Sequence, residues 1–192
     1  PMKKILMLTT GGTIASLPSE EGLAPTGADT ILSHMGPSAA NYDITTQEIL
    51  TLDSTNIQPE EWKVIAEAIY QNIRLYDGIV VTHGTDTMAY TASMMSFMLR
   101  NVPIPVVFTG SQVPIASPLS DAPLNLTCAF AMAASATPGI FVAFDRKIML
   151  GCRSVKVRTT DFDAFKSVNW PLVGSVDAGG LHIDPAALPP RP

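Results

Sequence analysis

The chain has 192 residues, of which 46% are hydrophobic and 15% are charged. This length and composition predict one α/β domain with a large buried core and little disorder. The formal net charge is -5 and no lysine or arginine run stands out, which argues against a nucleic-acid-binding surface.

Cysteine usage and the apolar segments indicate a cytoplasmic protein. Cys128 and Cys152 have neither CxxC nor metal-ligand spacing, and two lone thiols suit a reducing compartment better than one disulfide. The apolar run at 5–8 is too short for a signal peptide, and the runs at 88–99 and 128–135 are too short to span a bilayer. We therefore expect a soluble protein in the cytoplasm that does not associate with a membrane.

Short apolar runs alternate with helical patterns along the chain, which is typical of a doubly wound, mostly parallel sheet flanked by helices. Pro59 is expected at the first position of its helix, and Asp121 is expected to cap another. In chain order, the pattern predicts a strand at 4–9, a polar loop at 14–29, a helix at 29–35, a strand near 47–52, a helix at 59–70, a strand at 78–82, a helix at 87–100, a strand at 105–108, a helix at 121–136, a strand at 139–144 and extended, paired segments over 147–158.

The last eight residues have a different composition from the rest of the chain. They contain four prolines, which is typical of an extended linker and not of a core. The sequence thus predicts a domain over 1–184 and an interdomain linker over 185–192.

Three predicted strands end in turns that combine glycine with hydroxyl, amide or carboxylate side chains. The turns are Thr10-Gly11-Gly12-Thr13, His83-Gly84-Thr85-Asp86 and Thr109-Gly110-Ser111-Gln112. In an open α/β sheet, ligands bind beyond the carboxyl ends of the strands. We therefore expect the three turns to converge on one site.

The first turn is a candidate for a nucleophile. Gly11 and Gly12 permit positive φ and close backbone approach, so Thr13 would lie among backbone N–H groups, as a nucleophile with an oxyanion hole requires. A tight turn in which the threonine only caps the following segment explains the same residues equally well.

A second polar cluster is expected from Thr85, Asp86 and Lys156. Asp86 could hold an amino group, Thr85 could hold a water, and Lys156 could lie beside both from an alternating strand. Considered singly, Thr85 and Asp86 are slightly better explained as helix N-caps, and Lys156 is better explained as a solvated strand lysine.

The remaining polar residues carry weaker signals. Within Asp53-Ser54-Thr55-Asn56, Ser54 could bind a carboxylate, although such residues also favour turns. His83 at a strand end is more typical of a structural histidine. No metal-ligand pattern and no dinucleotide or P-loop motif is present, so neither a metal nor a cofactor is expected.

Two signatures taken together resemble the bacterial L-asparaginase family. They are Thr10-Gly11-Gly12-Thr13-Ile14-Ala15 and His83-Gly84-Thr85-Asp86-Thr87-Met88, and the resemblance covers nearly the whole chain. Asp53-Ser54-Thr55 and Gly110-Ser111-Gln112 resemble the cytoplasmic, type I branch more than the periplasmic branch. The resemblance implies the flavodoxin-like N-terminal domain of that family.

The resemblance also implies a reaction and a role for each matching residue. The reaction is hydrolysis of L-asparagine to L-aspartate and ammonia, with Thr13 as the nucleophile. Thr85, Asp86 and Lys156 would position substrate and water. Asp53, Ser54, Thr55 and Asp86 would bind the α-carboxylate and α-amino groups, and Ser111 would lie near the leaving amide.

The chain departs from the family pattern in two ways. Family members carry a tyrosine in the loop after the first signature, where this chain has Leu23. They also carry a smaller C-terminal domain that completes the site and assemble as homodimers or homotetramers. We therefore expect this chain to be an isolated N-terminal domain with weakened activity.

Two other functions fit the same residues. One is a module that binds an amino acid without turnover. The other is the asparaginase-like subunit of a tRNA-dependent amidotransferase, which ranks last because no basic surface is evident.

Overall fold

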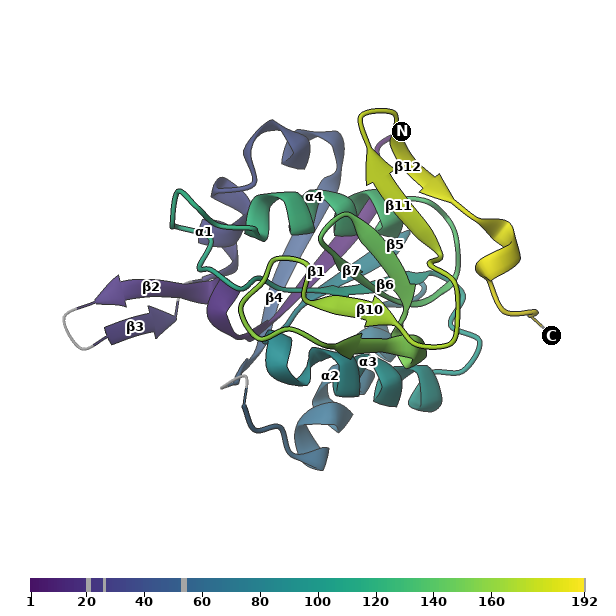
Figure 1. The fold of residues 1–192 in the computed structure, drawn as a ribbon, viewed down its shortest axis with the longest axis horizontal. Coiled ribbons are helices and arrows are strands. Elements are labelled where there is room, and N and C mark those ends of the chain that lie inside the picture. The colour runs from purple at the N-terminus through teal and green to yellow at the C-terminus, as the bar shows by residue number, and fades with distance from the viewer. Residues whose placement is uncertain (20–21, 26, 53–54, 192) are drawn as a thin grey trace.

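A computed structural model describes residues 1–19, 22–25, 27–52 and 55–191, and these form one main sheet of eight strands (Figure 1). The strand order is β12-β11-β8-β7-β6-β5-β1-β4. The five strands from β4 to β7 are parallel, and the other three continue the sheet in antiparallel pairing. The bounds are β1 Lys4–Gly11, β4 Asp43–Leu52, β5 Gly78–Thr82, β6 Pro105–Thr109, β7 Gly139–Phe144, β8 Lys147–Leu150, β11 Gly174–Asp177 and β12 Gly180–Ile183.

Helices cover both faces of this sheet, which confirms the predicted doubly wound fold. The helices α1 (Ala28–Ser33) and α4 (Ala122–Ala133) pack on one face, and α2 (Pro59–Asn72) and α3 (Thr85–Met98) pack on the other. Figure 1 shows α4 on the opposite side of the strands from α2 and α3.

The core consists of two apolar layers separated by the sheet. In β5, Val80 joins the layer under α1 and α4, while the next residue, Val81, joins the layer under α2 and α3. All five residues of β5 and of β6 are buried. Parallel strands that are covered on both faces read as continuous apolar runs, because neither face meets water.

Of the two residues predicted to mark helix beginnings, Pro59 is confirmed and Asp121 is not. Pro59 occupies the first turn of α2, and the Glu61 carboxylate accepts a hydrogen bond from the Gln58 backbone N–H at 2.9 Å. Asp121 stands at the N-cap position of α4 but makes no side-chain cap bond. The capping role predicted for Asp121 is therefore wrong, because its carboxylate accepts backbone N–H groups of another turn.

Two segments differ from the prediction. The loop expected over 14–29 contains a 3-10 turn, η1 (Thr13–Ala15), and an antiparallel hairpin formed by β2 (Ser16–Ser19) and β3 (Gly22–Pro25). Figure 1 shows this hairpin projecting from the body of the domain. Its Pro- and Gly-containing sequence has no apolar alternation, so the pairing was not visible in the sequence. The strand expected near 47–52 begins earlier, at Asp43.

Short elements complete the chain. The extended segments expected over 147–158 are β8, the 3-10 turn η3 (Gly151–Arg153) and β9 (Ser154–Lys156), which pairs with β10 (Phe165–Ser167). Another 3-10 turn, η2 (Gly36–Asn41), precedes β4.

The segment expected to be a linker begins with residues that pack on the domain. It opens with the 3-10 turn η4 (Pro185–Ala187), and the Trp170 indole N–H donates to the Ala187 carbonyl at 2.6 Å. Further on, the Arg191 guanidinium donates to the Asn101 and Val102 carbonyls at 3.2 and 3.0 Å. The domain boundary at 184 stays a prediction.

Candidate active site

The site lies where the order of the strands reverses direction. From β1 the chain passes outward to β4 and then returns to β5 on the other side of β1. In open α/β sheets this switch point, at the carboxyl ends of the strands, is where ligands bind. Thr13 follows β1 and Thr85 follows β5, so the two threonines flank the switch point.

Backbone packing at two glycines brings the three polar turns together. A Cβ atom on Gly12, which has a φ of 90°, would lie 2.6 Å from the backbone nitrogen of Gly84. A Cβ on Gly110 would lie 2.2 Å from the His83 carbonyl oxygen. Only glycine fits at such approaches. The predicted convergence of the three turns is thereby confirmed.

Thr13 opens the η1 turn directly after these glycines. Its side chain is half-buried, and its neighbour Ile14 is completely buried. The Ile14 carbonyl accepts the Ile115 N–H at 3.3 Å, and the Gly12 N–H donates to Leu52 O at 3.3 Å. The nucleophile candidate is therefore carried by a turn that is held to β4 and to the segment after β6.

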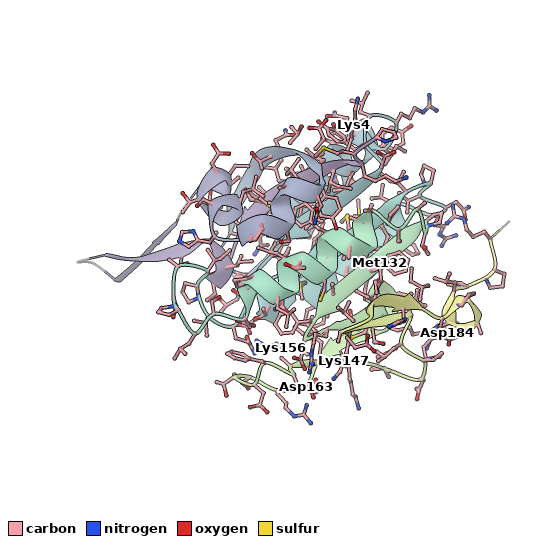
Figure 2. All side chains as sticks on the ribbon, turned by 90° about the horizontal axis from the view of Figure 1, so that it is seen from above. Lys4, Met132, Lys147, Lys156, Asp163 and Asp184 are labelled. Atoms are coloured by element: carbon pink, nitrogen blue, oxygen red, sulfur yellow. The ribbon has the colours of Figure 1, made fainter. Side chains whose placement is uncertain are left out.

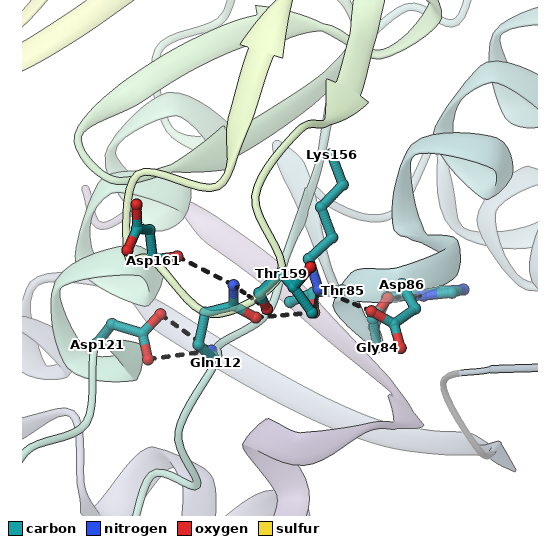
Figure 3. Close-up of polar contacts among 9 residues, drawn as sticks. Gly84, Thr85, Asp86, Gln112, Asp121, Lys156, Thr159 and Asp161 are labelled. Atoms are coloured by element: carbon teal, nitrogen blue, oxygen red, sulfur yellow. Dashed lines mark hydrogen bonds and ion pairs between the residues drawn. The ribbon is translucent and has the colours of Figure 1, made fainter.

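Lys156 connects the second polar cluster. Its ammonium donates to Thr85 Oγ1 at 2.8 Å and to Asp86 Oδ1 at 2.7 Å, across about 70 residues of sequence (Figure 3). Its side chain is only 14% exposed, whereas that of Asp86 is 46% exposed. The alternative of a solvated lysine is wrong. The N-cap alternative is wrong as well, because Gly84 occupies the N-cap position of α3.

Gln112 also contacts this cluster, although the sequence assigned it no role. Its Oε1 accepts the Thr85 hydroxyl at 3.1 Å, and its Nε2 donates to the carbonyls of Thr159 and Asp161 at 3.1 and 3.0 Å (Figure 3). Its backbone N–H donates to the Asp121 carboxylate at 3.0 and 3.1 Å. The only signal in the sequence was its place in the third turn.

The structure gives less information on the other predicted substrate-binding residues. Ser111 is buried, and its hydroxyl donates to the Val113 carbonyl at 2.6 Å, within its own turn. Thr55 is exposed beyond the end of β4. Asp53 and Ser54 lie outside the described residues. The substrate contacts expected of these four residues stay predictions.

His83 is buried behind the second turn and serves structure. Its Nδ1 is 2.8 Å from the Gly84 carbonyl, and its Nε2 is 2.9 Å from Thr91 Oγ1, which also accepts the Trp62 indole N–H at 3.0 Å. The carbonyl can only accept, so Nδ1 carries the proton and Nε2 accepts from Thr91. Burial lowers the pKa of His83, which keeps the ring neutral.

Across the described parts of the chain, no group of three or more His, Cys, Asp or Glu residues could hold a metal ion. No described helix combines the length and apolarity needed to cross a membrane.

A protein-family model described as "Asparaginase, N-terminal" matches residues 4–188. The chain belongs to the asparaginase family. An L-asparaginase of Thermococcus kodakarensis is 53% identical over 175 residues, which are 90% of this chain and 53% of that protein. The solved structure of the thermostable L-asparaginase from Thermococcus kodakarensis has a TM-score of 0.90 at 49% identity, over 98% of this chain and 57% of that one.

A second kind of relative is similar to most of this chain. A glutamyl-tRNA(Gln) amidotransferase subunit of Methanosarcina mazei is 37% identical over 187 residues, which are 92% of this chain and 44% of that protein. The chain thus spans about half the length of the curated relatives it matches.

Proposed function

We propose that this asparaginase-family chain carries the nucleophile and the substrate-binding turns of an L-asparaginase, which hydrolyses L-asparagine to L-aspartate and ammonia. The observation that carries the proposal is the Lys156–Thr85–Asp86 cluster, packed beside the glycine turn that bears Thr13. The similarity to proteins named L-asparaginase supports this substrate.

The reaction proceeds in two displacements at the side-chain amide carbon. The Thr13 hydroxyl oxygen attacks this carbon and loses its proton, which passes to the amide nitrogen, so that the C–N bond breaks and ammonia leaves. Water then attacks the resulting ester, which releases the aspartate carboxylate and returns a proton to Thr13. Backbone N–H groups of the converging turns would stabilise the oxyanion that forms in each displacement.

The polar cluster positions substrate and water for these displacements. Asp86 accepts one hydrogen bond from Lys156 and keeps nearly half of its side chain exposed, so it can also accept the α-ammonium group. Asp53, Ser54 and Thr55 would hold the α-carboxylate at the end of β4, and Ser111 would line the pocket near the leaving amide. Thr85 and Lys156 would hold the attacking water.

The test is release of ammonia and aspartate from L-asparagine. We expect turnover that is lost in Thr13→Ala and partly retained in Thr13→Ser, which keeps a hydroxyl group at that position. An unchanged rate in Thr13→Ala would remove Thr13 from the mechanism. If a folded chain shows no turnover, the same assay on a chain that spans the length of the L-asparaginase relatives decides whether further residues complete the site.

The setting of the reaction is also a proposal. We infer a cytoplasmic protein that forms a homodimer or homotetramer in its full-length form, with no nucleic-acid or membrane partner. Cys128 and Cys152 are both free, which suits a reducing compartment. Cell fractionation tests the compartment and membrane association, and light scattering with and without nucleic acid tests the oligomeric state and nucleic-acid binding.

The asparaginase-like subunit of a tRNA-dependent amidotransferase is the second candidate, favoured by the 37% identity to the Methanosarcina mazei protein. An amino-acid-binding module without turnover is the third. Turnover of free L-asparagine without a partner selects the first function. Ammonia release that depends on an amidotransferase partner selects the second, and binding of L-aspartate without any turnover selects the third.

A further inference from the structure

Gln112 lies between the polar cluster of Thr85, Asp86 and Lys156 and the 157–163 loop that follows β9. Its side chain contacts Thr85 Oγ1 on one side and the carbonyl oxygens of Thr159 and Asp161 on the other, as Figure 3 shows. We call this set of three contacts the Gln112 bridge. None of the catalytic and binding roles proposed for the site depends on Gln112.

The chemistry of these partners determines how the Gln112 amide is oriented. Backbone carbonyls can only accept hydrogen bonds, so the NH₂ group of Gln112 must face Thr159 and Asp161. Its carbonyl oxygen then faces Thr85. Because that oxygen can only accept, the Thr85 hydroxyl must donate its proton to Gln112.

The contact with Lys156 also requires the Thr85 hydroxyl to donate its proton to Gln112. Its ammonium group can only donate, so Thr85 Oγ1 accepts from Lys156 while it donates to Gln112. A hydroxyl oxygen has two acceptor sites, and one remains after the bond from Lys156. Thr85 is therefore prepared to accept a hydrogen bond from a water or a substrate N–H group.

The loop at the far end of the bridge is held to the domain independently. Asp163 pairs with Lys147 of β8, and the Arg158 guanidinium donates to the Asp163 carbonyl at 2.8 Å. The Val157 N–H also donates to the Ala164 carbonyl at 2.7 Å. Figure 2 shows Lys147 and Asp163 close together, on the same side of the molecule as Lys156.

We propose that Gln112 is a positioning residue that directs the Thr85 hydroxyl proton away from Lys156 and ties this orientation to the 157–163 loop. Catalysis would then depend on a loop that acts on the cluster through two of its backbone carbonyls. This inference rests on the proposed function for its effect on rate, but the bridge itself can be tested without turnover.

The test without turnover is a double-mutant cycle on the free energy of unfolding. Gln112→Met keeps the length of the side chain and removes both ends of the bridge, and Thr85→Val removes the hydroxyl. We expect Gln112→Met to destabilise the wild type more than it destabilises the Thr85→Val background, because contacting residues are not additive. Equal effects in both backgrounds would overturn the contact between the two side chains.

Gln112→Glu supplies a pH signature that a purely packing role would not give. The carboxyl oxygen that replaces the Gln112 NH₂ group would face the carbonyls of Thr159 and Asp161, and it could donate to one of them only when it is protonated, which raises the pKa of this carboxyl group in the folded state. The stability lost relative to wild type should therefore be small below a pH of about 4.3, the ordinary pKa of glutamate, and should grow as the pH rises. A difference that is independent of pH contradicts the bridge.

The rate measurement tests the role in catalysis. For L-asparagine we expect Gln112→Met to lower kcat roughly tenfold with a KM within about twofold, since one neutral hydrogen bond contributes up to about one tenfold step. Gln71→Met is the matched control, because it makes the same change on the exposed face of α2 and should keep the wild-type kcat.

The two proposals fail in different ways. Turnover in the wild type with equal kcat values in Gln112→Met and Gln71→Met would overturn the positioning role and leave the asparaginase proposal intact. A wild type without turnover that still shows the non-additive cycle and the pH signature would retain the bridge and overturn the activity of this chain.

Discussion

Two networks of hydrogen bonds begin at the His83–Asp86 turn, and they differ in burial and in their capacity to bind a ligand. The rear network runs from the Gly84 carbonyl through His83 and Thr91 to Trp62, and His83 and Thr91 are buried. The front network joins Thr85 and Asp86 to Lys156 and Gln112 at the partly exposed edge of the sheet.

The difference indicates a division of labour along one turn. The ring nitrogens of His83 both have partners, and His83 and Thr91 are buried, so the rear network stabilises the backbone of the turn and is not accessible to a ligand. In the front network, Asp86 stays 46% exposed and Thr85 keeps an acceptor site, so this side can bind substrate. Substitutions in the front should have their largest effect on the rate, and those in the rear should have theirs on stability.

Lys156→Met should produce the largest effect and break the front network. It removes the only charged donor that joins Thr85 and Asp86 in the described site, so we expect kcat to fall by several orders of magnitude with little change in melting temperature. Ammonia release and thermal unfolding are measured together. Lys166→Met is the matched control, because Lys166 is the exposed residue of β10, and a near-normal rate in Lys156→Met would reduce Lys156 to a structural role.

His83→Ala should give the largest loss of stability. The change leaves a cavity behind the turn and an unpaired Gly84 carbonyl, so we expect the free energy of unfolding to fall by about 3 kcal/mol. Urea denaturation measures this loss. His34→Ala, at the exposed end of α1, is the control and should cost less than about 1 kcal/mol. Similar losses in both variants would contradict the rear network.

Thr91→Val should have a smaller effect because it keeps the shape of the side chain. It removes the hydroxyl that links His83 to Trp62, and we expect a loss of about 1–2 kcal/mol in urea denaturation. The kcat of the folded variant should remain close to that of the wild type. A fall in kcat as large as that expected for Lys156→Met would show that the two networks are coupled.

The smallest expected effect is the pH dependence that His83 gives to the free energy of unfolding, and it tests whether the rear network keeps this histidine neutral. Burial holds the pKa of His83 below 6.5, so the unfolded chain binds a proton in a pH range where the folded chain does not. The contribution of His83 is complete above pH 6.5 and is lost as the pH falls toward its folded pKa. Between these values it adds a slope of at most about 1.4 kcal/mol per pH unit.

Urea denaturation from pH 7 to pH 5 measures this slope. His83→Asn carries no titrating ring, so its stability should fall less steeply than that of the wild type over the same range. Equal slopes in the two proteins would show that His83 titrates normally and that the rear network does not keep it neutral.

Much of the fold was readable from the sequence. Central strands such as β5 and β6 are continuous apolar runs between turn residues, and these runs occur only where both faces are buried. Pro59 marked the start of α2. The β2–β3 hairpin was missed, because an antiparallel pair with proline and glycine shows no hydrophobic period, and the docking of Leu188 and Arg191 was missed, because proline content says nothing of distant partners.

The residues themselves determined which chemistry is available at the switch point. Each of the three turns follows an apolar strand, and parallel strands end at the same edge of a sheet, so Thr13, Thr85 and Asp86 were expected at one edge. Only the tertiary structure decided the rest. It placed Lys156 on Thr85 and Asp86, put Gln112 between Thr85 and the 157–163 loop, and assigned the Asp121 carboxylate to the third turn in place of its own helix. The physical reason is that local patterns encode burial and backbone shape, whereas the partner of a long polar side chain depends on which distant segments folding brings within about 3 Å.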